Sequence, residues 1–252
     1  MISRKEIIKR SKRHNHDENV WVHPFSGRVS SWVTWIFVNL GMSANQVTQL
    51  CALAGVASAL VLAFDSFPFV IASFILFRLH VLFDVADGEV ARYRSQISRF
   101  GSYWDQLMHV AVYPLILMSL VVGRLLNDAS ATVAILGMAG MIGKGLDLGA
   151  KNAYFRVLYS SGPSAKPVSS TLVTSAPANR LKQAAGLVLH LQGFDGLLFF
   201  YCIAYLVDGS WLNLLARDWV LAMYCANFIL VALIRVLLIP RRDAVPMRKD
   251  FR

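Results

Sequence analysis

Residues 67–122 read FPFVIASFILFRLHVLFDVADGEVARYRSQISRFGSYWDQLMHVAVYPLILMSLVV, two long apolar runs on either side of a polar connection. Each run is long enough to supply the ~20 mostly apolar residues with which a helix crosses the ~30 Å hydrocarbon core of a bilayer. The stretch therefore predicts two antiparallel membrane-spanning helices joined by a short loop. Apart from Arg78 and His80, its acidic and basic residues gather around that loop, within residues 84–109.

Further apolar runs occupy most of the remaining chain. Of its 252 residues, 56% are hydrophobic and 16% are charged, and the mean hydropathy is +0.51, too apolar for one soluble core. We predict an all-α, polytopic membrane protein with six transmembrane helices. An amphipathic helix over 24–40, with Arg28 and the two tryptophans Trp32 and Trp35, is expected to lie along the membrane surface before them. The predicted spans are 45–64, 67–91, 102–122, 129–150, 186–207 and 217–239.

Lysine and arginine are concentrated in four segments: the N-terminal tail, the 92–101 loop, segment 151–185 and the C-terminal tail. The positive-inside rule then predicts that both termini and the charged loop face the cytoplasm. Attraction to anionic lipid headgroups explains the net charge of +10 without a nucleic-acid partner.

We divide the chain into three parts: a basic tail and juxtamembrane helix (1–40), a six-helix membrane domain (41–240) and a second basic tail (241–252). Residues 1–20 are expected to be a solvated tail. Segment 158–183, rich in Ser, Pro and Ala, predicts a long cytoplasmic loop that acts as a linker or as a lid.

Acidic residues recur at helical spacing on both sides of the charged loop. Asp84 and Asp87 lie on one face of the first helix, and Asp105 and His109 on one face of the second. Counted at ~1.5 Å per residue from the loop, the two sets come to similar depths. Carboxylates held so close in a dehydrating environment repel one another unless a cation lies between them. Hard oxygen ligands suit Mg²⁺ or Mn²⁺, so we predict a site for one or two such ions.

The spacing Asp84-x2-Asp87-Gly88-x2-Ala91-Arg92-x8-Gly101-x3-Asp105 resembles the signature of the CDP-alcohol phosphotransferases, also called CDP-alcohol phosphatidyltransferases. These six-span membrane enzymes move a substituted phosphate from a CDP-linked donor to an alcohol and release CMP. The resemblance implies a transferase of phospholipid or related lipid biosynthesis, with Asp84, Asp87 and Asp105 as metal ligands. It also implies a set of contacts to the CDP part of the donor: Gly88, Ala91, Arg92, Ser98, Gly101, Asn45 and Thr48.

His109 departs from the family pattern, which has a fourth aspartate at this position. A neutral imidazole can accept a proton, and it can ligate Mn²⁺ or Zn²⁺, although it is a poor ligand for Mg²⁺. We expect His109 to be the catalytic base and a further metal ligand. Two other outcomes stay open: an altered metal site, and a family member that binds nucleotide without turnover.

The signature leaves the substrate pair undefined. The length of the chain and its single six-span unit favour CDP-diacylglycerol over a smaller CDP-alcohol as donor, and the acceptor is open. Lys144, Asp147 and Lys151 on span four predict either an internal ion pair or acceptor recognition. His80, one turn from Asp84, is expected to orient that aspartate or to be hydrogen-bonded in the core.

Two other classes of function compete with the enzyme. A cation transporter would use the three aspartates as a pathway, but the apolar halves FPFVIASF and YPLILMSLVV provide no continuation across the bilayer. A dimerising scaffold would rest on Gly145 and Gly149, a small-xxx-small pair, but it explains none of the carboxylate spacing. A homodimer of the enzyme is expected as a separate matter.

Overall fold

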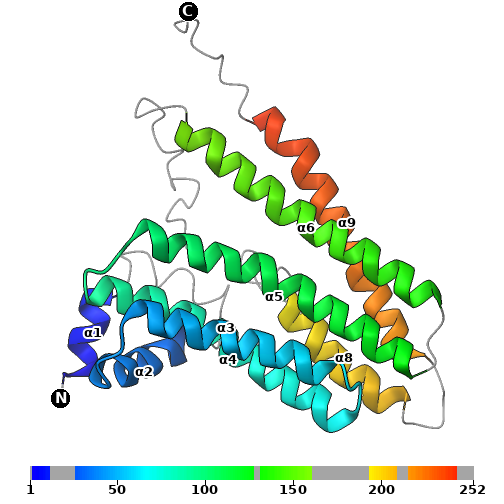
Figure 1. Ribbon diagram of the computed structural model, residues 1–252, viewed down its shortest axis with the longest axis horizontal. Helices are drawn as coiled ribbons and strands as arrows, with labels where there is room; N and C mark the ends of the chain where they lie inside the picture. Colours follow the sequence, from blue (N-terminus) through cyan, green and yellow to red (C-terminus); the bar gives the residue numbers. More distant parts are fainter. Residues whose placement is uncertain (1, 12–25, 128–130, 161–192, 209–214, 243–252) are drawn as a thin grey trace, which may run out of the picture.

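The computed structural model describes residues 2–11, 26–127, 131–160, 193–208 and 215–242, and these residues form helices and no strand. Figure 1 shows the helices in sequence colours. Their bounds are α1 (Arg4–Ser11), α2 (Ser26–Asn39), α3 (Ala44–Leu62), α4 (Phe67–Tyr93), α5 (Arg99–Leu126), α6 (Ala131–Ser160), α8 (Phe194–Asp208) and α9 (Ala216–Arg242). The predicted all-α class is confirmed.

Five of these helices are long and apolar enough to cross a bilayer: α3, α4, α5, α6 and α9. They coincide with five of the six predicted spans. The sixth, predicted over 186–207, is described only from residue 193, and its helix α8 has 15 residues. The structure is thus that of a multi-pass membrane protein, compatible with six spans. Most of the predicted loop 158–183 lies outside the described residues.

Local sequence signals set where the helices begin. Ser43 and Gln46 form a capping box at the start of α3, in which each side chain accepts a hydrogen bond from the main-chain N–H of the other residue. Ser98 caps α5, because its hydroxyl oxygen accepts the Gly101 amide at 2.9 Å. Pro68 lies in the first turn of α4, where its missing N–H costs no hydrogen bond.

Helix α3 is the central element of the bundle, since α4 and α5 each pack extensively on α3 and far less on each other. Gly55 makes this approach close: a Cβ at this position would lie 2.8 Å from a methyl of Val112 and 2.9 Å from Nδ1 of His80. The antiparallel helices α4 and α5 therefore meet through their side chains, and both pack on α3. This arrangement positions the residues that the sequence analysis singled out.

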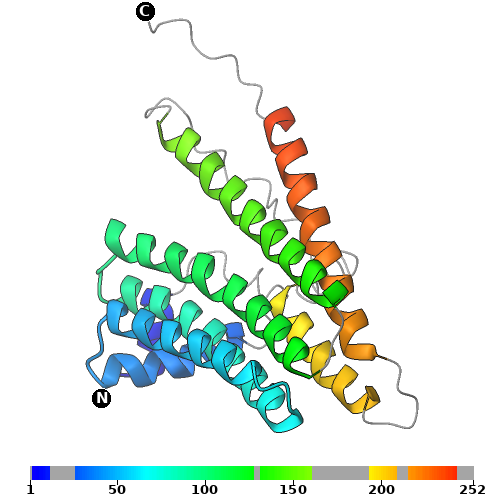
Figure 2. The same ribbon diagram turned by 45° about the vertical axis from the view of Figure 1, so that its right-hand side comes forward.

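Helices α6 and α9 form a long pair beside α5, seen from two directions in Figures 1 and 2. A Cβ at Gly143 would lie 2.8 Å from the main-chain nitrogen of Ile229, and one at Gly140 would clash with the sulfur of Cys225. These two glycines bring the backbones together. A Cβ at Gly145 or Gly149 would have no atom of another helix within 4 Å, so among the described residues these two glycines bring no helix close to α6.

The predicted surface helix is α2, which packs on α4. Ser30 and Thr34 on its inner face donate hydrogen bonds of 3.0 Å and 2.7 Å to Glu89, which is fully buried. Trp32 and Ile36 on its outer face are 53% and 46% exposed, as expected for a helix that borders lipid headgroups.

Residues 4–11, expected within a solvated tail, instead form helix α1 on α2 and α4. The reason is Ile7, whose side chain is fully buried in an apolar cluster with residues of α2, α3 and α4. Eight residues are too few to hold a helix by hydrogen bonds alone, so this packing is what stabilises α1.

A buried ionic network joins the helices where α3, α5 and α8 end and α9 begins, which we call the far end. Asp65 pairs with Arg124 at 3.2 Å and with Arg217 at 3.1 Å, and it accepts a hydrogen bond of 2.8 Å from the Tyr201 hydroxyl. Burial alone would raise the pKa of Asp208, but hydrogen bonds from the Arg217 side chain and from two main-chain amides outweigh it and lower that pKa. The sequence analysis did not identify this network.

Candidate active site

Three predicted site residues converge between α4 and α5: Asp84 from α4, and Asp105 and His109 from α5. Each offers one ligand atom, and these three atoms all lie within 4.8 Å of one another. His109 Nε2 is 3.6 Å from an oxygen of Asp84 and 3.6 Å from an oxygen of Asp105. We call this group the carboxylate–imidazole cluster.

The donor atoms of this cluster fit a divalent cation. Two carboxylates supply hard, negatively charged oxygens, and the imidazole adds a nitrogen, a set that Mn²⁺ accepts well and Mg²⁺ accepts through its oxygens. The side chains of Asp84 and Asp105 are 29% and 37% exposed, so an ion could enter from solvent. Nδ1 of His109 is buried and makes no hydrogen bond within the described part of the chain, so it is Nε2 that meets the carboxylates.

Asp87 lies near this cluster but is not one of its three members. It is 9% exposed and accepts a hydrogen bond of 2.7 Å from the hydroxyl of Thr48 on α3. Asn45, one turn before Thr48, approaches the start of α5, because a Cβ at Gly101 would lie 3.8 Å from its side-chain oxygen. The structure therefore brings the two predicted residues of α3 next to the predicted residues of α4 and α5.

Arg92 folds back along α4 over Gly88. A Cβ at Gly88 would lie 3.2 Å from Nη1 of Arg92 and 3.8 Å from Nη2, so the glycine makes room for the guanidinium. Ala91 is instead partly buried against the apolar cluster that contains Ile7 and Val90. Of the predicted CDP contacts on α4, Gly88 and Arg92 thus lie together, whereas Ala91 faces the packing of α1 and α2.

A column of stacked aromatic rings leads away from His109. Its ring stacks on Tyr113 with centroids 5.3 Å apart, Tyr113 stacks on Phe194 at 4.8 Å, and Phe194 stacks on Phe228 at 5.0 Å. The ammonium of Lys144 lies 5.4–5.8 Å from the last three ring centroids, within the range of cation–π attraction. These contacts connect the carboxylate–imidazole cluster to α6, α8 and α9.

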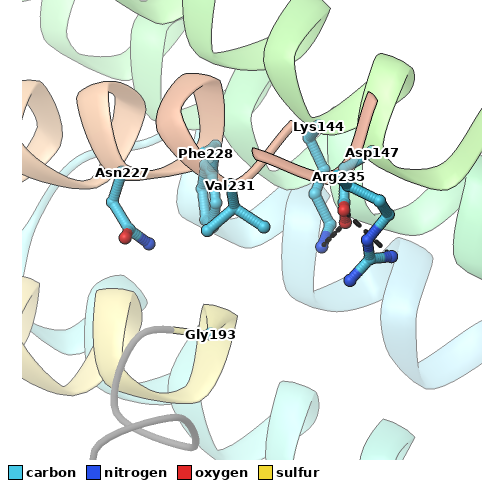
Figure 3. A pocket seen from close by; sticks show the side chains of 7 residues that line it. All are labelled: Lys144, Asp147, Gly193, Asn227, Phe228, Val231 and Arg235. Atoms are coloured by element: carbon cyan, nitrogen blue, oxygen red, sulfur yellow. Dashed lines mark hydrogen bonds and ion pairs between the residues drawn. The ribbon is translucent and has the colours of Figure 1, made fainter. Parts of the chain in front are cut away.

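A pocket of about 170 Å³ opens where this column reaches α9. Figure 3 shows Asp147 between the two cations of the pocket, 3.3 Å from Lys144 and 3.0 Å from Arg235. The remaining lining residues are Gly193, Asn227, Phe228 and Val231. The predicted internal ion pair of Lys144 and Asp147 is confirmed, and Arg235 joins it, a contact that periodicity along one helix could not reveal.

His80 bonds a neighbouring helix and not Asp84. Its Nδ1 lies 2.9 Å from the carbonyl oxygen of Cys51 and 3.2 Å from the Cys51 sulfur, and the ring is 1% exposed. Its ring also meets that of His109 edge to face, with centroids 6.4 Å apart. Arg78 and Asp195, to which we assigned no role, form an ion pair of 2.6 Å between α4 and α8.

Comparison with known proteins agrees with this geometry. A sequence model of the family described as CDP-alcohol phosphatidyltransferase matches residues 41–189, more than half of the chain. A comparison of the chain with curated proteins finds no match. Members of the family transfer a phosphate-linked group from a CDP-alcohol in lipid synthesis and generally use a divalent metal. The matched residues include the whole carboxylate–imidazole cluster. The chain belongs to the CDP-alcohol phosphatidyltransferase family.

Proposed function

We propose that this protein transfers a substituted phosphate group from a CDP-linked alcohol, with CDP-diacylglycerol as the favoured donor, to an acceptor hydroxyl and releases CMP. The observation that carries the proposal is the convergence of Asp84, Asp105 and His109 within 4.8 Å, at positions where the sequence matches the family. Two carboxylates in such proximity need a cation, and a cation next to a diphosphate suits this reaction.

The carboxylates of Asp84, Asp87 and Asp105 would hold Mg²⁺ or Mn²⁺, with His109 available as a further ligand. When bound, the metal supplies positive charge that neutralises the diphosphate oxygens and the departing CMP. Thr48 keeps the Asp87 carboxylate in place through its hydrogen bond. Arg92, whose guanidinium can pair with two phosphate oxygens, would bind the donor beside Gly88, and Asn45, Ser98 and Gly101 would complete its site.

His109 would accept the proton of the acceptor hydroxyl, so that the hydroxyl oxygen attacks the β-phosphorus. Its Nε2 faces the carboxylates of Asp84 and Asp105 at 3.6 Å, and these negative charges stabilise the imidazolium formed by proton transfer. The same nitrogen cannot bind a metal and accept a proton at once. Substitutions at position 109 therefore separate the two roles.

The pocket of Lys144, Asp147 and Arg235 supports a place for the acceptor. Two cations and one carboxylate leave it a net positive charge, and the aromatic column connects it to His109. An acceptor with an anionic group, such as a sugar or polyol phosphate, fits this charge better than a neutral alcohol.

We also place both termini and the active site on the cytoplasmic side, because the four basic segments fall on one side of the predicted spans and only Arg124 and Arg217 fall on the other. Residues 41–240 would form the catalytic membrane domain, between the basic segments 1–40 and 241–252. A homodimer stays a prediction, for which Gly145 and Gly149 offer small residues where a Cβ would have no atom of another described helix within 4 Å.

The decisive experiment measures CMP release by the purified protein from CDP-diacylglycerol and from smaller CDP-alcohols, with a panel of hydroxyl acceptors and with Mg²⁺ or Mn²⁺. Asp84→Asn should abolish release, because it removes a charged ligand of the cluster. His109→Ala should lower kcat more than it weakens CDP binding, and His109→Asp should keep activity and favour Mg²⁺ over Mn²⁺. Wild-type turnover in Asp84→Asn would refute the metal assignment, and CDP binding without CMP release from any pair would identify a non-catalytic member.

A further inference from the structure

We propose that α1 is part of the donor site, where it positions the Arg92 guanidinium for the phosphates of the CDP group. This inference rests on the proposed function and extends it to a helix outside the matched residues 41–189. It begins from a contact between segments far apart in the sequence: Nε of Arg92 donates a hydrogen bond to the main-chain carbonyl oxygen of Ser11.

Helix α1 is held firmly enough to act as a support. Ile7 is fully buried and Ser11 is 1% exposed, so the end of the helix that meets Arg92 is shielded from solvent. At the other end, the Ile2 amide donates to Asn39 at 3.0 Å, and the Trp35 indole donates to the Ile2 carbonyl oxygen at 2.9 Å. The contacts at both ends fix the helix on α2 and α4.

The three nitrogens of the Arg92 guanidinium have different neighbours. Ser11 takes Nε, while Nη1 and Nη2 lie over Gly88, next to Asp87 in the sequence. The planar fork of an arginine binds phosphate oxygens through parallel N–H groups, and it binds more tightly when its orientation is set beforehand. Because the guanidinium is planar, the hydrogen bond at Nε also fixes where Nη1 and Nη2 lie over Gly88.

The acceptor in this contact is a main-chain oxygen, so a side-chain change at Ser11 would leave it in place. The useful perturbation undocks the helix instead. Ile7→Gln places a polar amide in the apolar cluster, whereas Lys9→Gln makes the same residue on the exposed face of α1 and serves as the matched control. Deletion of residues 2–11 is the second variant, which removes α1 without leaving a polar group in the cluster.

The test is equilibrium binding of CDP to the purified protein in detergent. It compares wild type with Ile7→Gln, the deletion of residues 2–11, the control Lys9→Gln, Arg92→Ala, and the double variant of Ile7→Gln and Arg92→Ala. We expect Ile7→Gln and the deletion to weaken CDP binding about tenfold, the scale of one hydrogen bond to a charged group, with Lys9→Gln near wild type. In the Arg92→Ala background, Ile7→Gln should weaken binding no further, because α1 acts through Arg92.

Two results would overturn the inference while leaving the proposed function intact. In the first, Arg92→Ala weakens CDP binding but both Ile7→Gln and the deletion bind CDP as wild type does. In the second, the effects of Ile7→Gln and Arg92→Ala multiply in the double variant, as expected if α1 only stabilises the fold. A wild-type protein that does not bind CDP would overturn both proposals together.

Discussion

Asp105→Asn should make the protein more stable when divalent cations are removed, although the substitution abolishes the proposed activity. Asp84 and Asp105 present their carboxylates within one cluster, and no lysine or arginine forms an ion pair with either among the described residues. At pH 8 a neutral His109 does not offset their repulsion. Replacing one carboxylate by a neutral amide of the same shape removes the repulsion and keeps the packing.

The magnitude follows from the separation. Two unit charges no more than 4.8 Å apart repel by at least ~3.5 kcal/mol at an effective dielectric constant of about 20. The side chains are 29% and 37% exposed, so solvent screening reduces this to about 1–2 kcal/mol. For a chain of this size, that difference corresponds to a rise in Tm of about 2–8 °C.

The assay is thermal unfolding in detergent at pH 8, with EDTA and with saturating Mn²⁺. With EDTA, Asp105→Asn should unfold at a higher temperature than wild type. With Mn²⁺, wild type should gain up to about 2.7 kcal/mol at a hundredfold excess over Kd, whereas the variant should gain little. Asp195→Asn is the matched control, because Asp195 pairs with Arg78 at 2.6 Å and its loss should destabilise the protein in both conditions.

Two results would contradict this prediction for Asp105→Asn. A lower Tm of Asp105→Asn in EDTA would show that the carboxylate stabilises the fold without a metal. A Tm of wild type that does not respond to Mn²⁺ or Mg²⁺ would show that the carboxylate–imidazole cluster holds no cation.

Three further predictions concern the α6–α9 contact, the far-end network and the hydrogen bond to Asp87. Gly143→Leu should destabilise the protein by about 1–3 kcal/mol, because its Cβ meets the Ile229 backbone, whereas Gly145→Leu should leave Tm unchanged; equal Tm values would contradict the close α6–α9 contact. Asp65→Asn should lower the free energy of unfolding by about 3–5 kcal/mol and lower the folded yield, because Arg124 and Arg217 lose the carboxylate with which they pair. An unaltered Tm would show that the far-end network is dispensable. Thr48→Val should weaken Mn²⁺ binding, since the Asp87 carboxylate loses a 2.7 Å hydrogen bond, whereas Thr34→Val removes an equal bond to Glu89 and should affect stability alone. Unchanged Mn²⁺ affinity in Thr48→Val would remove Asp87 from the ligand set.

The membrane-spanning helices were predictable because they follow from chain composition. A helix that crosses lipid must be apolar along its whole length, so its approximate bounds can be recognised without knowledge of its neighbours. The capping box of Ser43 and Gln46 is equally local, because it depends on two residues three positions apart. Helix α1 was missed because it has eight residues and depends on Ile7 entering a cluster built from three other helices.

The candidate site was predictable in part. Helical spacing brings Asp105 and His109 to one face of α5, and the short loop after α4 brings Asp84 within reach, as the structure shows. The hydrogen bond from Thr48 to Asp87 could not be derived in this way, because α3 has to lie against α4 in one register for the two side chains to meet. The same holds for Arg235, which reaches Asp147 from a helix 88 residues further along the chain.

Composition and short-range spacing were thus enough to define an all-helical membrane protein with an acidic site at one end. They suffice because the bilayer imposes helices of known length and because neighbours on one helix turn lie at known distances. The partners of Asp87, Arg92 and Asp147 came only from the packed bundle. Such contacts depend on how closely two helices approach and in which register. Glycines such as Gly55 and Gly143 allow a close approach because they have no Cβ.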